Sequence, residues 1–540
     1  MAAGISRRRF LGVAAGSAAL ATTGIGRLGL LDDARAATPV PDPVLFESIA
    51  SLRSRMGAGT LTSNSLTQAY IDRIQRLRVL NAVIEVNPDA PVIARQLDRE
   101  RRSGHVRGPL HGIPVLLKDN IATADAMQTT AGSLALFGSR VPHDAPIVSR
   151  LRTAGAVILG KANLSEWANF RGFAPFNGWS ARGGFTRDPY VLSADPCGSS
   201  SGSAVAVAAG LCAAAVGTET DGSVVCPSGN NGIFGLKPGI GVLSQDGIIP
   251  IGHSQDTAGP MGRYAADVAT MLDVMRSPNA SGTARPRDLD DARIGVDRRY
   301  FLRRFGGNPH INAVVEQGLD MMRDLGATIV DTDTGNPNKY GNDELTVLLF
   351  EFKVQVAEYL STLADTRMRT LQDLIRFNAL NCSAEMQFFG QQIFRMAEAT
   401  SGDLTDPTYV NARAKCVQLA RVDGIDAALA RDHLDAIVAP SYSFASSPAA
   451  VAGYPNLNIP IALASTGVPA GLWMYGTHGT EDQLLHFAAE IETARDAFPA
   501  PQLHGTVPPD PPDAGLCRAP DADAPEVVDR AQAMQRLRTL

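Results

Sequence analysis

The chain has 540 residues, of which 45% are hydrophobic, and a formal net charge of -6 at pH 7. A chain of this length buries a large core, and one large α/β domain is as consistent with it as two smaller domains. The acidic balance disfavours a nucleic acid or an anionic membrane as a partner, because both require a basic face. Small molecules and peptides are the ligands to expect.

Residues 1–36 are predicted to be a targeting segment. Residues 6–11 read SRRRFL, the twin-arginine export pattern, and an Ala/Gly-rich apolar run leads to a small-residue cleavage site near 34–36. A basic, solvated tail is the alternative. Because the apolar run is short, rich in glycine and interrupted by Arg27, no stable membrane span is expected. The sequence therefore predicts the twin-arginine export machinery as a partner and a periplasmic or secreted location.

Residues 37–498 have the pattern of one alternating α/β domain. Short apolar strands that alternate with amphipathic helices predict a buried sheet, largely parallel or mixed. The strands are expected at 112–118, 156–161 and 434–440. The helices are expected at 44–52, at 65–77 behind the capping candidates Thr62, Ser63 and Asn64, and at 145–153 behind Asp144.

Two later regions depart from this alternation. Residues from about 312 to 431 are mainly helical in pattern. Residues 499–540 form a C-terminal tail, and its part from 499 to 525 is dense in Pro, Asp and Ala. That composition suits an extended tail or a surface wrap.

The cysteines and histidines give no sign of a metal or of a disulfide framework. The six cysteines are irregularly spaced without a C-x-x-C pair, and they are interpreted mostly as buried small hydrophobic residues. His105, His111 and His143 have no histidine or cysteine partner at i+3 or i+4. No metal and no other cofactor is predicted.

Lys118 is the first candidate catalytic residue. Lysine is rare in this chain, with six among 49 basic residues, and Lys118 ends an apolar strand. A buried lysine can lose its proton and act as a base, whereas arginine stays charged. A lysine that extends from the strand end into solvent is the alternative.

Residues 197–223 contain two Gly/Ser clusters joined by an almost purely apolar bridge. Such loops aim backbone N–H groups at one point, which suits a phosphate or a developing oxyanion. No Gly-Lys-Ser/Thr follows either cluster, so the phosphate interpretation fails. The sequence therefore indicates a serine catalytic site.

The first cluster also fits a different serine enzyme. Residues 198–202 match the G-x-S-x-G nucleophile elbow of α/β-hydrolases, which would make Ser200 the nucleophile. The histidine that an elbow requires has four downstream candidates: His253, His433, His478 and His486. This alternative leaves Lys118 and the second cluster unexplained.

Four segments together resemble the amidase signature family, in that family's order. They are HGIPVLLKDN at 111–120, GKANLSEWANF at 160–170, CGSSSGSAVAVAAG at 197–210 and GTETDGSVVCPSGNNGIFGLKP at 217–238. The likeness continues at 256–261, 452–455 and 467–472, and within the family it is greatest to bacterial peptide amidases. The resemblance implies an amidase-signature fold, in which helices cover both faces of a mixed, largely parallel twisted sheet.

The resemblance also implies a Ser-cisSer-Lys triad. By position, Ser223 is the nucleophile, Ser199 the proton relay behind a cis peptide bond and neutral Lys118 the base. Ser200 is expected to support this network by hydrogen bonding. The turn formed by Thr220, Asp221, Gly222 and Ser223 is expected to supply the oxyanion hole from its backbone N–H groups.

The substrate is predicted less sharply than the chemistry. Cys226 stands where some relatives carry an arginine, and the expected pocket walls lie in 312–431, near Phe352, and around Tyr454. The resemblance implies hydrolysis of the C-terminal amide of peptides to a free acid and ammonia. Alternatives are an amidase for aryl, fatty or small aliphatic amides, a subunit of a tRNA-dependent transamidation complex, and a family member without turnover.

Overall fold

The computed structural model describes residues 42–277 and 286–518. The targeting prediction for 1–36 and the last 22 residues of the tail lie outside the described residues. Within the described ranges, no helix has both the length and the apolar character needed to cross a bilayer.

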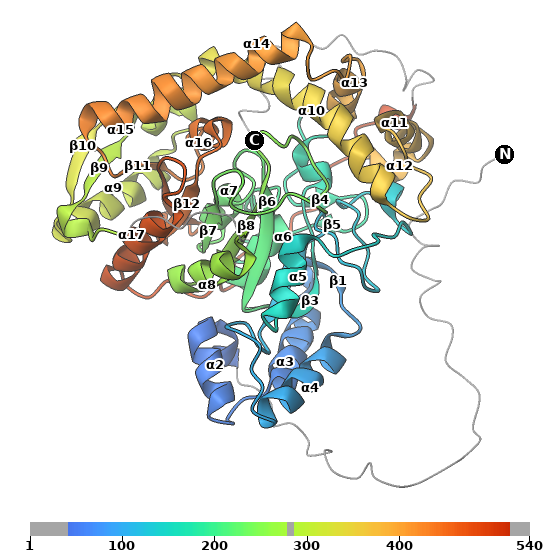
Figure 1. Cartoon of the computed structure of the whole chain (residues 1–540), viewed down its shortest axis with the longest axis vertical. Coiled ribbons are helices and arrows are strands. Elements are labelled where there is room, and N and C mark those ends of the chain that lie inside the picture. Colours follow the sequence, from blue (N-terminus) through green and yellow to red (C-terminus); the bar gives the residue numbers. More distant parts are fainter. Residues whose placement is uncertain (1–41, 278–285, 519–540) are drawn as a thin grey trace.

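An 11-stranded mixed sheet runs through the centre of the molecule (Figure 1). Four of its ten neighbouring strand pairs are parallel, so the predicted mixed sheet is confirmed, although antiparallel pairs outnumber the parallel ones. In spatial order the strands are β1 (Val83–Val86), β3 (Val157–Ala162), β2 (Pro114–Lys118), β6 (Ala214–Glu219), β8 (Thr257–Gly262), β7 (Phe234–Lys237), β12 (Asn456–Leu463), β13 (Pro469–Tyr475), β11 (Ala436–Pro440), β9 (Arg293–Val296) and β10 (Thr328–Asp331).

The central strands are apolar because both faces of the sheet are covered. Every residue of β2, β3 and β6 is buried. A continuous run of apolar residues in the sequence predicts that a strand is buried on both faces, but it does not predict whether the neighbouring strand is parallel or antiparallel. The short connection at 464–468 makes β12 and β13 antiparallel, and a tight connection of this kind cannot join parallel strands.

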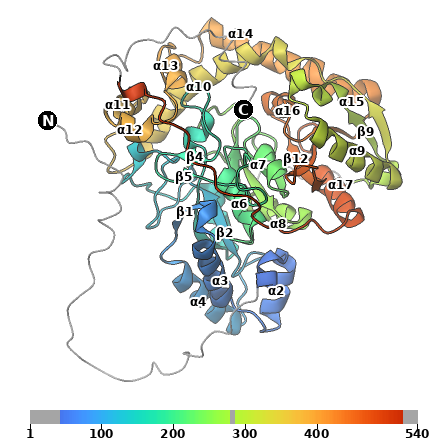
Figure 2. The same ribbon diagram turned by 180° about the vertical axis from the view of Figure 1, so that it is seen from behind.

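Helices pack on the two faces of this sheet in separate groups (Figures 1 and 2). One group contacts β6, β7, β12 and β13 and consists of α6 (Ser201–Ala208) and α7 (Val225–Asn230). The other consists of α8 (Ala265–Met275), α9 (Pro309–Asp324) and α17 (Glu481–Ala494), in which α17 contacts both partners. The N-terminal helices are α2 (Ile49–Gly57), α3 (Ser63–Arg76), α4 (Ala90–Arg102) and α5 (Pro146–Thr153).

Capping explains where the N-terminal helices begin. The Thr62 hydroxyl accepts from the Ser65 N–H and closes a capping box, so α3 starts as predicted. The helix expected at 44–52 is interrupted, because Ser48 caps a new helix, α2, after the 3₁₀ turn η1 (Asp42–Phe46). Asp144 does not cap α5; its carboxylate accepts from the Ala124 N–H and binds Arg152.

The mainly helical region forms an arch across the top of the molecule in Figure 1, from the side of β9 and β10 to α11 and α12. Its long members α10 and α14 contact each other, and α10, α11 and α13 bury a separate apolar cluster against the segment 164–173. Strand β10 interrupts the predicted helical pattern. The helices are α10 (Gly341–Thr362), α11 (Leu371–Leu380), α12 (Cys382–Glu385), α13 (Gln392–Glu398), α14 (Pro407–Cys416), the π-helix η9 (Val417–Asp426) and α15 (Ala427–Asp432), followed after β11 by α16 (Ser446–Ala452).

The described part of the tail, 499–518, lies along the surface from α17 to the α11–α12 region (Figure 2). The N–H of Leu503 donates to the Pro189 carbonyl at 3.0 Å, and that of His504 donates to the Tyr190 carbonyl at 2.8 Å. A disulfide between Cys517 and Cys382 attaches its end to α12.

Two disulfides correct the expectation that the cysteines are mostly unpaired. Cys197 pairs with Cys226 across 29 residues, and Cys382 pairs with Cys517 across 135. Only the fold brings these thiols together, so their spacing in the sequence carries no signal. Cys212 and Cys416 are free and buried, as the sequence predicts for most of the six.

Candidate active site

Lys118 lies at the end of β2 with none of its surface exposed to solvent. Its Nζ is 2.8 Å from the Ser199 hydroxyl, 2.9 Å from the Thr218 hydroxyl and 3.1 Å from the Thr218 carbonyl oxygen. Burial lowers the pKa of Lys118 from 10.5 to about 7, although the charges of Asp256 and Glu219 oppose this. The amine is therefore neutral in about half of the molecules at pH 7, and the alternative of a solvent-exposed lysine is wrong.

Ser199 follows a cis peptide bond that joins it to Gly198. Ser199 is fully buried, and its carbonyl accepts from the Ser165 N–H at 3.0 Å. These contacts fix the hydroxyl of Ser199 against the Lys118 amine.

Ser200 supports the network through backbone contacts. Its hydroxyl donates to the Thr218 carbonyl at 3.0 Å and accepts from the Thr218 N–H at 3.2 Å. Its own N–H donates to the Ser223 carbonyl at 3.1 Å, which ties the two Gly/Ser clusters together. Ser200 is fully buried at the start of α6, and among the described residues no histidine bonds to it. The arrangement is not that of a nucleophile elbow.

Ser223 lies in a turn between β6 and α7 that the Glu219 side chain shapes. One Glu219 carboxylate oxygen accepts from the N–H groups of Val224 and Val225 at 2.7 and 2.9 Å, and so caps the start of α7. Gly222 has a φ of 78°, a conformation that other residues rarely adopt.

Within the described ranges, the N–H groups of Gly222 and Ser223 have no hydrogen-bond acceptor. Two unused donors at one turn suit a developing oxyanion. Among the same residues, no hydrogen bond joins the hydroxyls of Ser199 and Ser223. Catalytic hydrogen bonds in unliganded enzymes often form only when substrate is bound.

A cavity of about 440 Å³ opens beside Ser223, large enough for a small peptide. Gly198, Gly222 and the disulfide between Cys197 and Cys226 form part of its wall. Thr220 and Asp221 also line it. The other walls come from Ala168, Asn169, Phe170, Asn177, Ile251, Arg303, Gly306, Pro337, Asn338, Gly341, Glu344, Leu345, Leu348, Tyr442, Ser443, Phe444, Ser446, Ser447 and Trp473.

Two of the three predicted pocket residues do not line this cavity. Cys226 does, as half of a disulfide. Phe352 packs behind the wall against Phe170, with ring centroids 5.3 Å apart. The Tyr454 hydroxyl donates to Asp426 at 2.8 Å, away from the cavity. The sequence did contain a pattern that marks the residues of α10 that line the cavity. They recur at helical spacing and so share one face of the helix: Gly341, Glu344, Leu345 and Leu348. Phe352 lies on the same face, one turn beyond the cavity.

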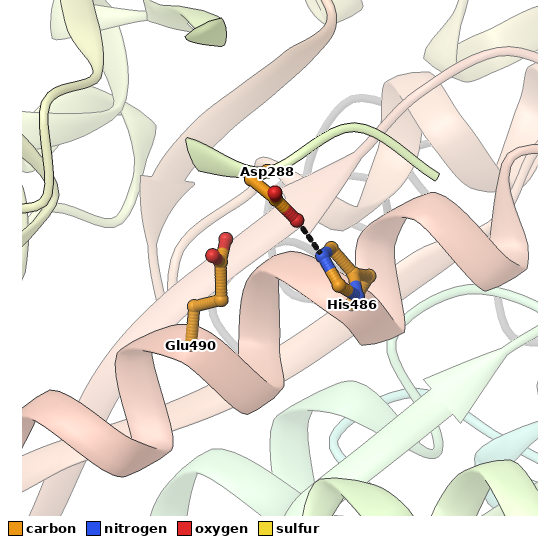
Figure 3. Close-up of side chains that lie close together, drawn as sticks. All are labelled: Asp288, His486 and Glu490. Carbon is orange, nitrogen blue, oxygen red and sulfur yellow. Dashed lines mark hydrogen bonds and ion pairs between the residues drawn. The ribbon is translucent and has the colours of Figure 1, made fainter. Parts of the chain in front are cut away.

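A group of potential metal ligands lies outside this site, where the segment around Asp288 meets α17 (Figure 3). Figure 3 shows His486 and Glu490, one helical turn apart, facing Asp288. The His486 Nε2 is 2.7 Å from the Asp288 carboxylate, and Glu490 accepts from the Leu289 N–H at 2.8 Å. These contacts hold the segment around Asp288 on α17, which gives the group a structural role.

Comparison with known proteins identifies the family. The family model for amidases matches residues 65–485. The chain belongs to the amidase signature family. A probable amidase from Arabidopsis thaliana is 40% identical over 463 residues, which cover 83% of this amidase and 90% of the relative.

Solved structures share the fold of this amidase. The native peptide amidase from Stenotrophomonas maltophilia is 46% identical, with a TM-score of 0.81, over 86% of this chain and all of that one. A complex of a peptide amidase with the competitive inhibitor chymostatin gives the same identity and TM-score over 85% of this chain and all of that one. A glutamyl-tRNA(Gln) amidotransferase component from Methylobacillus flagellatus is 32% identical over 480 residues, 82% of this chain and 96% of the relative. The predicted family, the α/β fold and amidase activity are thereby confirmed.

Proposed function

We propose that this amidase hydrolyses the C-terminal carboxamide of peptides through an acyl-enzyme on Ser223. The observation that carries the mechanism is the contact between the buried, half-neutral Lys118 amine and the Ser199 hydroxyl. A neutral amine accepts the proton of that hydroxyl, and Ser199 in turn takes the proton of Ser223.

The reaction consists of acylation of Ser223 followed by hydrolysis of the acyl-enzyme. The Ser223 oxygen attacks the amide carbon while its proton passes through Ser199 to Lys118. The oxyanion that forms accepts from the backbone N–H groups of Gly222 and Ser223. The C–N bond then breaks, the Lys118 ammonium returns its proton through Ser199 to the leaving nitrogen, and ammonia departs. Water repeats the same transfers at the acyl group and releases the acid.

Two features favour peptide amides over other amides. The 46% identity is to a peptide amidase, and a peptide amidase also binds chymostatin, a peptide-like inhibitor. The cavity presents backbone and side-chain polar groups beside an apolar wall that includes Leu345, Leu348 and Trp473. That combination suits a peptide backbone with an apolar side chain.

The enzyme is also proposed to be exported from the cytoplasm and to act outside a transamidation complex. The twin-arginine pattern supports export to the periplasm or beyond, and two disulfides suit an oxidising compartment. Export also argues against a role in a transamidation complex, because the tRNA substrate of such a complex is cytoplasmic. Cell fractionation, with Arg7 and Arg8 changed to lysine as the control, tests the location: an unchanged distribution would contradict export by this route.

Ammonia release across a panel of amides tests the substrate. Peptide amides are expected to be hydrolysed at least tenfold faster, as kcat/KM, than aryl, fatty and small aliphatic amides. The matched free-acid peptides should remain intact, because the enzyme acts on the terminal carboxamide. Turnover of aryl or aliphatic amides without any turnover of peptide amides would refute the peptide assignment.

A further inference from the structure

Lys237 is a second fully buried lysine beside the catalytic turn, and the mechanism above does not use it. It ends β7, and its Nζ donates to three backbone carbonyls: Glu219 at 3.3 Å, Thr220 at 2.7 Å and Gln255 at 2.6 Å. The first two carbonyls belong to the residues that enter the turn carrying Ser223.

The partners of Lys237 select its charged form. Carbonyl oxygens only accept hydrogen bonds, and an ammonium has three N–H groups, one for each carbonyl. A neutral amine has two, and it would turn its lone pair toward a third oxygen. The pKa of Lys237 is lowered from its usual value because burial outweighs the opposing charges of Glu219, Asp221, Asp256 and Glu344, so the three carbonyl contacts are what favour the ammonium form. Lys118 differs, because two of its three contacts are to hydroxyls, which also donate.

The contact to Thr220 polarises the peptide group that immediately precedes the oxyanion donors Gly222 and Ser223. The Thr220 carbonyl and the Asp221 N–H belong to one peptide unit, and a cation bonded to the oxygen polarises the N–H into a stronger donor. The same holds for the Glu219 carbonyl and the Thr220 N–H. In both peptide groups the carbonyl oxygen faces Lys237, and the N–H groups of Thr220 and Asp221 point away from it.

Lys237 also joins the turn to two neighbouring segments. The carbonyl of Gln255 is one of its acceptors, and the Gln255 side chain donates to Glu344 at 3.0 Å on the cavity wall. The adjacent Asp256 accepts from the Thr220 hydroxyl at 2.6 Å. Hydrogen bonds therefore hold the turn through the backbone carbonyls of Glu219 and Thr220 and through the Thr220 side chain.

We propose that Lys237 is a positioning residue for amide hydrolysis, whose ammonium group fixes and polarises the turn that presents Ser223 and the oxyanion donors. This inference rests on the proposed function, since it assigns the turn to the transition state. It predicts that loss of the charge lowers kcat and leaves ground-state binding of the substrate nearly unchanged.

The test compares Lys237→Met with Lys161→Met. Lys161 is equally buried, but its Nζ binds the Ile121 carbonyl and the Thr129 hydroxyl and contacts neither the turn nor Gln255. Both variants should lose thermal stability. Relative to Lys161→Met, Lys237→Met should lower kcat about 30- to 100-fold and change KM less than threefold. Lys237→Arg, which keeps the charge, should recover a substantial part of kcat.

The outcomes separate this inference from the proposed function. If the wild-type enzyme releases no ammonia from any amide, the proposed function itself is wrong. An active wild type with kcat of Lys237→Met within threefold of Lys161→Met would overturn the role of Lys237 alone. If Lys237→Met does not fold, Lys237→Gln keeps two N–H donors without the charge, and an unchanged kcat in that variant would equally overturn the proposal.

Discussion

The lowered pKa of Lys118 predicts the pH dependence of the enzyme. An ordinary lysine with a pKa of 10.5 is neutral in about one molecule in three thousand at pH 7. Burial brings the pKa of Lys118 to about 7, a difference of about 5 kcal/mol in the relative stability of its two protonation states. Because the base must be neutral, activity should rise as the pH increases through about 7 and level off above pH 8.

The assay is kcat/KM for ammonia release at subsaturating peptide amide, measured from pH 5 to 9.5. At pH 6 the value should be about a tenth of the plateau, and at pH 8 about nine-tenths. Lys118→Arg places a permanently charged guanidinium in the same site, so it should lose at least about a thousandfold in kcat at every pH. A rising limb centred above pH 9, or near-normal turnover by Lys118→Arg, would refute the neutral-amine mechanism.

Five further variants, in three comparisons, test the remainder of the site. Ser223→Ala should lose at least about a thousandfold in kcat, whereas Ser200→Ala should lose about tenfold, because the Ser200 hydroxyl binds only the Thr218 backbone; the reverse order would favour a nucleophile elbow. Gly222→Ala should lower kcat about 100-fold, since Gly222 has a φ of 78° and an added Cβ would lie 3.3 Å from the Ser446 hydroxyl; unchanged kcat would count against the oxyanion role. Opening the disulfide at Cys197 with Cys197→Ala/Cys226→Ala should lower both kcat and Tm, whereas Cys382→Ser/Cys517→Ser should lower Tm alone; equal kcat in the two double variants would show that the disulfide in the cavity wall has no part in positioning the site.

Local patterns predicted much of the fold. The apolar runs at β2, β3 and β11 are strands, and the capping residues before α3 mark its start. Strand direction was not predictable from these runs, because burial on both faces produces the same composition in parallel and antiparallel neighbours. Long-range pairing was equally invisible: the disulfide between Cys382 and Cys517 joins residues that are close only after folding.

The three catalytic residues could be predicted from the sequence, whereas most of the cavity wall could not. Lys118, Ser199 and Ser223 were assigned by resemblance, and the structure places Lys118 against Ser199 and ties the segment of Ser199 to that of Ser223. The cavity wall depends on side chains from α10 and from the segments near Arg303 and Tyr442. Their juxtaposition follows from the path of the helical arch, which no local pattern in the sequence encodes.

The site of covalent modification tests whether Ser223 is the nucleophile and Lys118 its base. The enzyme would be treated with a serine-directed phosphonate, weighed intact by mass spectrometry and then mapped by peptide sequencing. A single adduct is expected on Ser223, and it should form at least a thousandfold more slowly in Lys118→Arg because the nucleophile then lacks its base. An adduct on Ser200, or labelling of Ser223 at an unchanged rate in Lys118→Arg, would contradict this mechanism.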